Sequence, residues 1–244
     1  MFQGRSVGVV IPAYNEERHI AQTLASVPDY VDSVVVVDDC STDNTWRAAS
    51  NVKRPGLTVL RGRVNEGVGG AIVRGYQELK QQGLEVAVVM AGDGQMDPQD
   101  LPALLAPLVA DEADYCKGNR LYHRDTPRVM PGWRFAGNAT LSVLTRASAG
   151  YRDIVDSQCG YTALRLALLD RLELDRIYPR YGFPNDFLAH LHSAGARVAQ
   201  VEVRPVYEGQ KTGIKPVQAV FALSYVLIRS YILRISREGP GGRK

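Results

Sequence analysis

The amino-acid sequence predicts an α/β fold in which a mostly parallel sheet carries helices on both faces. Short apolar runs alternate with helical patterns along the first half of the chain, and each apolar run ends in a polar, turn-like segment. The expected strands are residues 7–11, 34–37, 57–60 and 86–90, and the expected helices are residues 16–27, 42–51, 68–82 and 99–110. Right-handed crossovers then bring all four strand-end segments to one rim of the sheet.

Each of these elements has a local signal. The first strand ends in Pro12-Ala-Tyr-Asn-Glu16, and the second is a run of four valines that ends at Asp38-Asp39. The third strand leads into Asn65-Glu-Gly-Val-Gly-Gly70, and the fourth, Val86 to Met90, is apolar and mostly β-branched. Pro98 opens the fourth helix, as helix entry prefers.

The second half is less regular. Residues 114–117 form a fifth expected strand that ends in Gly118-Asn-Arg120, and a loop over residues 121–132 follows. Further helices are expected at residues 133–147, 163–172 and 184–194, before an alternating strand at residues 197–203. We expect residues 1–215 to form one domain, and residues 216–244 to form a C-terminal amphipathic helix with a basic tail.

Composition excludes several classes of protein. With 244 residues, 45% hydrophobic and 23% charged, the chain is an ordinary globular protein. A net charge of +3 and the lack of an RNA-binding aromatic pattern argue against a nucleic-acid partner. Three widely spaced cysteines suggest reduced thiols. No secretory signal is visible, and no apolar stretch reaches the roughly 18–20 residues that span a bilayer, so we expect a cytoplasmic protein.

The segment Val88-Val-Met-Ala-Gly-Asp-Gly-Gln-Met-Asp-Pro98 carries the strongest chemical signal. Asp93, Gln95 and Asp97 stand just past the carboxyl end of a buried strand, where open α/β sheets bind ligands. Oxygen ligands on a turn suit a hard divalent cation, Mg²⁺ or Mn²⁺, which usually accompanies substrate phosphates. The alternative is a surface turn with solvated carboxylates, but the other polar loops on the same rim favour a metal–diphosphate site.

The other loops supply candidate nucleotide contacts. Asp38 and Asp39 can accept hydrogen bonds from a base or ribose, unless Asp39 only caps the next helix. Residues 65–71 fail the dinucleotide fingerprint because Ile72 replaces the third glycine, but the helix start there can cradle a phosphate. Arg120, at a strand end, suits a second phosphate because its guanidinium binds two oxygens at once. The alternative is a surface arginine.

Three features of the second half leave alternatives open. His190 and His192, two apart on a helix, do not share a face, so one packed and one solvated histidine is favoured over a metal site. Asp186 either suits a helix start through the dipole or projects toward the acceptor. Within residues 216–237, the run from Val217 to Ile228 is apolar nearly all round and has basic residues on either side. This pattern predicts a helix on a membrane surface, or one packed on the protein itself or in a dimer interface.

In order and spacing, these segments resemble family 2 glycosyltransferases of the GT-A fold, and among them the dolichyl- or polyprenyl-phosphate sugar synthases. The resemblance covers about residues 6–215. It rests on Val10-Ile-Pro-Ala-Tyr-Asn-Glu16, Val37-Asp-Asp39 with Ser41 and Asp43, Asn65-x-Gly67 with Gly70-Ala71, Gly92-Asp-Gly-Gln-Met-Asp-Pro98 and, more weakly, Gly118-Asn-Arg120 and Asp156-Ser-Gln-Cys-Gly-Tyr161.

The resemblance implies roles for the matching positions. Asp93 would be the last acid of the family's Asp-x-Asp motif and would bind Mg²⁺ or Mn²⁺ with Gln95, while Asp39 would hold the base. The nucleotide would lie against Pro12, Ala13, Tyr14, Glu16, Asp38, Asp39, Gly67 and Gly70. The catalytic residues would be Asp93, Arg120 and Asp186, and the acceptor contacts would be Arg120, Gln158, Lys211 and Lys215.

Two positions depart from the family pattern. Ala91 stands where the first acid of the Asp-x-Asp motif is usual, so the metal site has lost one carboxylate. An arginine usual in the polyprenyl-phosphate enzymes is replaced near Gln210, which leaves Lys211 and Lys215 as substitutes for acceptor phosphate recognition.

The expected activity is an inverting transfer of a sugar from a UDP- or GDP-linked donor to an acceptor, expected to be a polyprenyl phosphate at the cytoplasmic face of a membrane. No histidine or glutamate stands out as a general base, and a phosphate monoester is already an anion at neutral pH. A hydroxyl acceptor would need a base, for which Asp186 is the candidate. Alternatives are a soluble saccharide acceptor, a non-catalytic nucleotide-sugar-binding protein, and a sugar-phosphate nucleotidyltransferase, which the glycine-free segment 12–16 disfavours.

Overall fold

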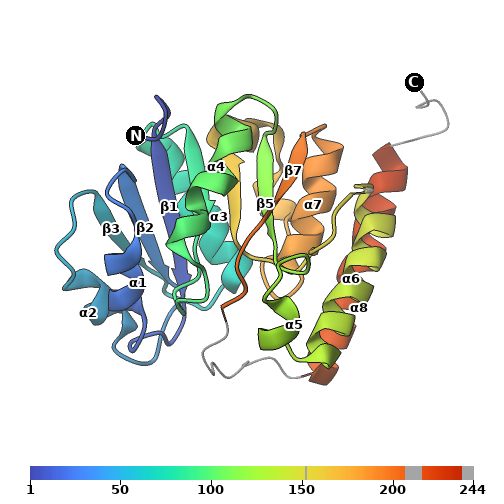
Figure 1. Ribbon diagram of the computed structural model, residues 1–244, viewed down its shortest axis with the longest axis horizontal. Helices are drawn as coiled ribbons and strands as arrows, with labels where there is room; N and C mark the ends of the chain where they lie inside the picture. Colours follow the sequence, from blue (N-terminus) through green and yellow to red (C-terminus); the bar gives the residue numbers. More distant parts are fainter. Residues whose placement is uncertain (152, 207–215, 238–244) are drawn as a thin grey trace.

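In the computed structural model, which describes residues 1–151, 153–206 and 216–237, seven strands form one sheet in the order β3-β2-β1-β4-β6-β5-β7 (Figure 1). The strands are β1 Val7–Ala13, β2 Ser33–Asp38, β3 Leu57–Arg61, β4 Val86–Val89, β5 Tyr115–Asn119, β6 Thr162–Arg165 and β7 Val198–Glu202. β6 runs antiparallel to β4 and β5, and the other neighbouring pairs are parallel. The predicted α/β class with a mostly parallel sheet is confirmed.

Helices cover both faces of this sheet. The α-helices are α1 Ile20–Ser26, α2 Thr45–Ser50, α3 Val68–Gln81, α4 Leu101–Val109, α5 Thr126–Val129, α6 Gly132–Ala149, α7 Phe183–Ser193 and α8 Pro216–Arg237. Short 3₁₀ helices occur at Pro98–Asp100, Leu166–Arg171 and Leu174–Arg176. The helix predicted at residues 16–27 begins later, at Ile20, and α5 lies inside the predicted loop 121–132.

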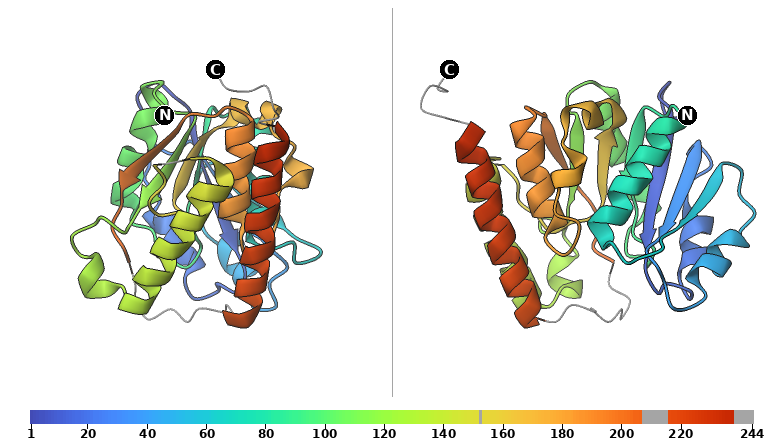
Figure 2. Two further views of the ribbon diagram at one scale, coloured as in Figure 1. Left: turned by 90° about the vertical axis from the view of Figure 1, so that its right-hand side faces the viewer. Right: turned by 180° about the vertical axis from the view of Figure 1, so that it is seen from behind.

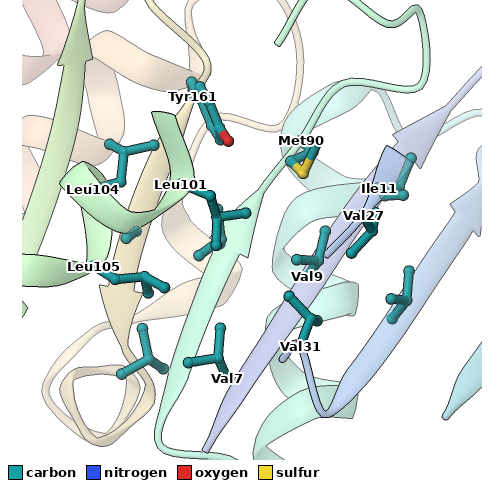
Figure 3. Packing of buried hydrophobic residues seen from close by; sticks show 14 of the residues in the cluster. Val7, Val9, Ile11, Val27, Val31, Met90, Leu101, Leu104, Leu105 and Tyr161 are labelled. Atoms are coloured by element: carbon teal, nitrogen blue, oxygen red, sulfur yellow. The ribbon is translucent and has the colours of Figure 1, made fainter. Parts of the chain in front are cut away.

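Strand alternation sends neighbouring residues of β1 to opposite faces. Val9 packs in the core formed with α1, α2 and α4, part of which Figure 3 shows. Val10 packs on the other side against α3 and α7. Two glycines permit the close approach of α3 to β1: a Cβ at Gly75 would lie 2.3 Å from Val10 Cγ1, and one at Gly8 would lie 2.5 Å from Leu79 Cδ2.

The helix predicted at residues 163–172 is wrong. Residues Thr162–Arg165 instead form β6, which pairs with β4 on one side and β5 on the other, and only Leu166–Arg171 turns, as a 3₁₀ helix. The leucine-rich sequence favours a helix locally, but pairing on both sides satisfies the backbone of a strand whose residues are almost all buried. The strand predicted at 197–203 and the helices predicted at 133–147 and 184–194 are confirmed within a few residues.

α8 packs on the domain beside α6 and α7, at the end of the molecule remote from β3 (Figure 2). Val226 and Leu223 are buried in this contact, and Arg229 donates a hydrogen bond from a terminal guanidinium nitrogen to Asp186 Oδ2 at 2.8 Å. No helix within the described ranges is long and apolar enough to cross a membrane.

Candidate active site

The loops after β1 and β2 are joined by hydrogen bonds from backbone to side chain. Asn15, whose φ of 59° is left-handed, accepts the Thr42 N–H on Oδ1 at 2.9 Å and donates its own N–H to Ser41 Oγ at 3.0 Å. The Glu16 N–H donates to Thr45 Oγ1 at 2.7 Å. Asparagine tolerates this backbone conformation better than other side chains, so the local sequence fixes the rim on which Tyr14 stands half-exposed.

Asp39 organises the glycine-rich loop rather than capping the next helix. Its two carboxylate oxygens accept the N–H groups of Glu66 and Gly67 at 2.7 and 2.8 Å, and its carbonyl accepts a hydrogen bond from Asn65 Nδ2 at 3.1 Å. Asp39 is almost fully buried. Asp39 thus sets the shape of the loop beside the predicted base site, and its contact with a base stays a prediction.

Asp38 is fully buried at the end of β2. Its Oδ1 accepts the Ser41 N–H at 3.2 Å, whereas Oδ2 has no hydrogen bond within the described residues and lies 3.7 Å from Arg61 Nε. A buried carboxylate oxygen without a hydrogen bond is costly, so it is a candidate acceptor for a bound group.

The amides of Gly67, Gly69 and Gly70, at the predicted phosphate cradle, already have protein partners. The N–H groups of Gly69 and Gly70 both donate to the Pro179 carbonyl, at 2.7 and 3.2 Å, and the Gly67 N–H is held by Asp39. The glycines serve close packing, because a Cβ at Gly69 would lie 2.4 Å from the Phe183 ring. Any nucleotide contact of Gly67 or Gly70 must use other atoms and stays a prediction.

Asp93 lies in the turn that follows β4. Its Oδ1 accepts the Gln95 N–H at 3.0 Å, and Thr23 Oγ1 donates to the Gly92 carbonyl at 3.2 Å, which ties the turn to α1. Burial raises the pKa of Asp93, although this hydrogen bonding and the charges of His19 and Arg134 oppose the rise.

Glu16 stands beside Asp93. A Cβ built at Gly92 would lie 3.6 Å from Glu16 Cγ, so this side chain passes over the glycine of the Asp93 turn. Burial raises the pKa of Glu16, and the negative charge of Asp93 raises it further. The structure thus brings two carboxylates together from separate loops, as the shared rim predicted.

Asp97 has a local structural role. Its Oδ1 accepts the Gln99 N–H at 2.9 Å, which caps the 3₁₀ helix at Pro98–Asp100, and its Oδ2 lies 3.0 Å from an Arg204 guanidinium nitrogen. Because both carboxylate oxygens of Asp97 have protein partners, we expect Asp97 to serve the structure and not to replace the acid that Ala91 lacks.

The oxygen ligands around Asp93 fit a divalent cation that is bound by few protein groups. The described residues contain no group of three or more histidine, cysteine, aspartate or glutamate side chains that could enclose a metal. Magnesium is commonly held by one or two carboxylates together with substrate phosphates and water. A cation here would also relieve the repulsion between the Asp93 and Glu16 carboxylates. The site therefore suits a metal ion that takes most of its ligands from the substrate phosphates and water and only one or two from the protein.

Arg120 is held by a residue whose role the sequence did not reveal. Asp156, which is fully buried, accepts hydrogen bonds from Arg120 Nε at 2.8 Å and from one terminal nitrogen at 3.1 Å. Burial alone would raise the pKa of Asp156, but the Arg120 guanidinium overrides burial and holds it below its usual value. Lys117, also fully buried, donates to the Cys159 carbonyl, and burial lowers its pKa.

Two further residues near the rim were missed or only partly understood. Arg134, on the first turn of α6, lies close enough to oppose the rise that burial causes in the pKa of Asp93 and of Tyr181. An arginine near the start of a helix that follows an irregular loop gave no distinctive sequence signal. Gln158 Nε2 donates to Ser157 Oγ at 2.8 Å and Asn185 Oδ1 at 3.2 Å, so its amide points into protein, and its acceptor role stays a prediction.

Asp186 does not reach the rim as a catalytic base. It is fully buried, and its Oδ2 accepts the Tyr178 N–H at 2.7 Å and a hydrogen bond from Arg229 at 2.8 Å. His190 Nε2 lies 3.5 Å from the same oxygen, and His190 is the packed histidine of the predicted pair. The prediction that Asp186 acts on the acceptor is therefore corrected, because its carboxylate joins α7 to α8. Lys211, Lys215 and Gln210 lie outside the described residues.

Two cavities lie elsewhere than at Asp93, and only the first is remote from the glycine-rich loop. One, of about 370 Å³, lies at the amino-terminal end of β4, opposite the Asp93 turn, and is lined by residues that include Arg5, Glu85 and Arg165. The other, of about 730 Å³, lies between α3 and the 3₁₀ helix at Leu174–Arg176, behind the glycine-rich loop.

Comparison with known proteins gives one consistent result. The family model described as glycosyl transferase family 2 matches residues 8–172. The UDP-N-acetylglucosamine–dolichyl-phosphate N-acetylglucosaminyltransferase of Methanococcus voltae is 27% identical, with 82% of this chain and 85% of that protein covered. The undecaprenyl-phosphate mannosyltransferase of Micrococcus luteus is 32% identical, with 80% and 81% covered.

Solved structures show the same fold. Glucosyl-3-phosphoglycerate synthase from Mycobacterium tuberculosis in complex with UDP superposes with a TM-score of 0.69 at 24% identity, over 93% of this chain and 80% of that one. Its complex with Mn²⁺, UDP and phosphoglyceric acid gives a TM-score of 0.67 at 23% identity, over 97% and 79%. The resemblance inferred from the sequence motifs is thereby confirmed: the chain belongs to glycosyl transferase family 2 and is a glycosyltransferase of the GT-A fold.

Proposed function

We propose that this glycosyltransferase moves a sugar, with inversion, from a nucleotide-diphosphate sugar to a polyprenyl phosphate at the cytoplasmic face of a membrane. The observation that carries the donor half is the position of Asp93. It lies past the carboxyl end of β4, beside Glu16 and near Arg134. The carboxylates of Asp93 and Glu16 and the guanidinium of Arg134 therefore lie together where open α/β sheets bind their ligands, the expected place for a diphosphate.

A divalent cation, Mg²⁺ or Mn²⁺, is part of the proposal. Asp93 would be its protein ligand, with Gln95 as a further contact in the same turn. Bound there, the cation would neutralise the negative charge that develops on the departing diphosphate. The chain's own contribution is to hold Asp93 in place, through the Gln95 N–H and the tie between Thr23 and Gly92. Structures of glucosyl-3-phosphoglycerate synthase with Mn²⁺ and UDP support this choice.

The acceptor half rests on chemistry and on relatives. A phosphate monoester needs no residue to remove a proton, because its second pKa is near 6 and it is already a nucleophilic anion. The burial of Asp186, the residue predicted as a base, against Arg229 supports an acceptor that needs no base. Relatives named for dolichyl-phosphate and undecaprenyl-phosphate acceptors support the same class of substrate.

Arginine would recognise the acceptor phosphate. Arg120 is largely buried, and Asp156 fixes its guanidinium plane by two hydrogen bonds. A preorganised guanidinium loses little conformational freedom when it binds phosphate, which makes it a better phosphate ligand than a mobile surface arginine.

The test is incubation of the full chain with labelled UDP- and GDP-sugars and undecaprenyl phosphate, with and without EDTA. The expected result is a labelled lipid whose formation requires a divalent cation. Transfer to a soluble saccharide or to phosphoglyceric acid, but never to lipid phosphate, would refute the acceptor half and leave the donor half standing. Full transfer in excess EDTA would refute the metal.

A further inference from the structure

Two residues just before α7 hold the glycine-rich loop, residues 65–70, in place. The Pro179 carbonyl accepts the N–H groups of Gly69 and Gly70 at 2.7 and 3.2 Å. Arg180 donates from one terminal guanidinium nitrogen to Asn65 Oδ1 at 3.2 Å, and from the other to the Asn65 carbonyl at 2.8 Å. We call Pro179 and Arg180 the loop clamp. It contacts a segment that lies 115 residues earlier in the chain.

The glycines of the loop make room for the loop clamp. Gly67 has a φ of 90°, and a Cβ there would lie 2.8 Å from Arg180 Cγ and 3.1 Å from Arg180 Cα. A Cβ at Gly69 would lie 2.8 Å from the Pro179 carbonyl oxygen. A side chain at either position would therefore push the loop clamp away, and glycine permits the close approach. The glycines thus have a structural use although their amides already have protein partners.

The loop clamp is itself anchored to the domain. The Tyr178 N–H donates to Asp186 Oδ2 at 2.7 Å, and the Arg180 carbonyl accepts the Phe183 N–H at 2.9 Å, which closes a turn into α7. Phe183 is buried where α7 contacts α3. Arg180 therefore stands on a segment that the core holds on both sides.

Asn65 connects the loop clamp to Asp39. Its side-chain oxygen accepts from Arg180, and its Nδ2 donates to the Asp39 carbonyl at 3.1 Å. The Asp39 carboxylate in turn accepts the N–H groups of Glu66 and Gly67. The loop is thus held from two sides, by Asp39 on one and by the loop clamp on the other.

An open cavity borders the loop on the side of the loop clamp. The cavity of about 730 Å³ behind the loop is lined by Glu66, Gly69 and Gly70, and by both residues of the loop clamp. A segment that faces open space has few packed contacts there, and such segments open easily. Hydrogen bonds from Arg180 therefore contribute a large share of what keeps Asn65 and Glu66 in place.

The same stretch of chain also approaches the Asp93 turn. Tyr181 follows the loop clamp, and Arg134 opposes the rise that burial causes in the pKa of both Tyr181 and Asp93. The segment before α7 is therefore close to the predicted base site through Asn65 and close to the proposed diphosphate site through Arg134.

We propose that Arg180 is a positioning residue for the donor: by holding the glycine-rich loop in one conformation, it raises the affinity of the protein for the nucleotide. This inference rests on the proposed function, in which the nucleotide lies beside Asp39. A protein whose binding-competent conformation is only partly populated binds its ligand with an affinity reduced by that fraction. Arg180 lies outside residues 8–172, which match the family model, so membership of the family does not by itself predict this role.

The first test is hydrogen exchange in the nucleotide-free full chain, read by mass spectrometry in peptides that cover residues 65–70. Arg180→Ala should speed exchange several-fold in these peptides and leave β1 and β2 unchanged. The matched control is Arg176→Ala, which removes an arginine that is 69% exposed and pairs with Glu173. The control should exchange like the parent. Unchanged exchange of residues 65–70 in Arg180→Ala would overturn the inference.

The second test is the affinity for UDP and for GDP, measured by titration calorimetry with Mn²⁺ present. Arg180→Ala should weaken binding of whichever nucleotide the parent binds by about tenfold, which corresponds to about 1.4 kcal/mol. Arg176→Ala should bind as the parent does. Because Arg180 is exposed, its variant should keep the urea unfolding midpoint of the parent within error. An unchanged affinity would overturn the inference.

A double-mutant cycle decides how Arg180 acts. Asn65→Ala breaks the same contact from the side of the loop, and it also serves if Arg180→Ala misfolds. If Arg180 acts through Asn65, the double variant should bind about as weakly as either single variant. Losses that add to about a hundredfold would show that Arg180 contacts the nucleotide by itself, and would overturn the positioning role. A parent that binds neither UDP nor GDP would refute the donor half of the proposed function, and the exchange measurement would still decide whether Arg180 holds the loop.

Discussion

Asp156 fixes the orientation of Arg120 by accepting hydrogen bonds from two nitrogens of its guanidinium, at 2.8 and 3.1 Å. The Arg120 backbone N–H also points to Asp156, at 3.2 Å. The Asp156 side chain has no exposed surface and that of Arg120 is 17% exposed, so water competes little for this pair. The second buried cation, Lys117, lies near enough to lower the pKa of Asp156 as well. Two positive charges therefore share one carboxylate at the edge of the proposed acceptor site.

Asp156→Asn should destabilise the fold by about 3 kcal/mol at neutral pH, because it leaves a buried guanidinium without its counter-charge. The pKa of Asp156 is lowered in the folded chain. Its stabilising contribution is therefore complete above the unfolded-state value of about 3.9 and is lost as the pH falls through the lower folded value. Urea unfolding of both proteins from pH 7 to about pH 4 should show a constant difference that shrinks only in stronger acid. A difference that disappears already near pH 6 would contradict this assignment.

Asp93 and Asp97 should respond differently to the same substitution. Asp93→Asn should lower the rate of sugar transfer by roughly a hundredfold or more, because it removes the carboxylate proposed to hold the cation. Asp97→Asn should change the rate little and reduce stability by about 1 kcal/mol, since Asp97 caps a 3₁₀ helix and pairs with Arg204. Initial rates and thermal melts of both variants provide the comparison. Equal losses of rate would show that Asp97 takes part at the site.

Ala91→Asp should tighten divalent cation binding in the presence of the nucleotide by about tenfold, which corresponds to about 1.4 kcal/mol. The substitution restores the first acid of the motif two residues before Asp93. Titration calorimetry of Mn²⁺ into the protein with saturating UDP or GDP measures the change. Ala91→Asn, which adds similar volume without charge, is the control, and an equal gain with asparagine would exclude a carboxylate effect.

Two glycines in helix interiors should respond with opposite signs to replacement by alanine. Gly75→Ala should destabilise the protein by about 1–3 kcal/mol, because the new Cβ would lie 2.3 Å from Val10 Cγ1 in a packed core. Gly137→Ala, in α6 with nothing within 4 Å of the new atom, should stabilise it by up to about 1 kcal/mol through helix propensity. Urea unfolding of the two variants tests the packing of α3 on β1.

The elements predicted correctly are those whose signals are local. The valine runs of β1 and β2 and the turns that follow them are visible in short windows, and strand–helix alternation then places Glu16 and Asp93 on the same rim. β6 was missed because its strand state depends on partners on both sides, β4 and β5, while Leu164 and its neighbours favour a helix in isolation.

Errors at the candidate site have the same origin. The amides of Gly69 and Gly70 look available in the sequence, but their partner, the Pro179 carbonyl, lies far along the chain. Asp186 looks like a helix-start acid free to act, but its partner Arg229 comes from the last helix. Residue types predict what chemistry a position can perform, and long-range contacts decide whether the group remains available for it.

β6, the strand that runs antiparallel to its neighbours, also determines the order in which the sheet can be completed during synthesis. On one side of β1 the pairs β1–β2 and β2–β3 join strands that leave the ribosome consecutively. On the other side β6 must enter between β4 and β5, both of which emerge before it, and β7 then pairs with β5. The part of the sheet formed by β1 to β4 can therefore assemble while translation continues. β5, in contrast, gains its first neighbour in the sheet only when β6 emerges, after α6. A nascent chain stalled before Thr162 would present β4 with an open edge, the arrangement that molecular chaperones protect.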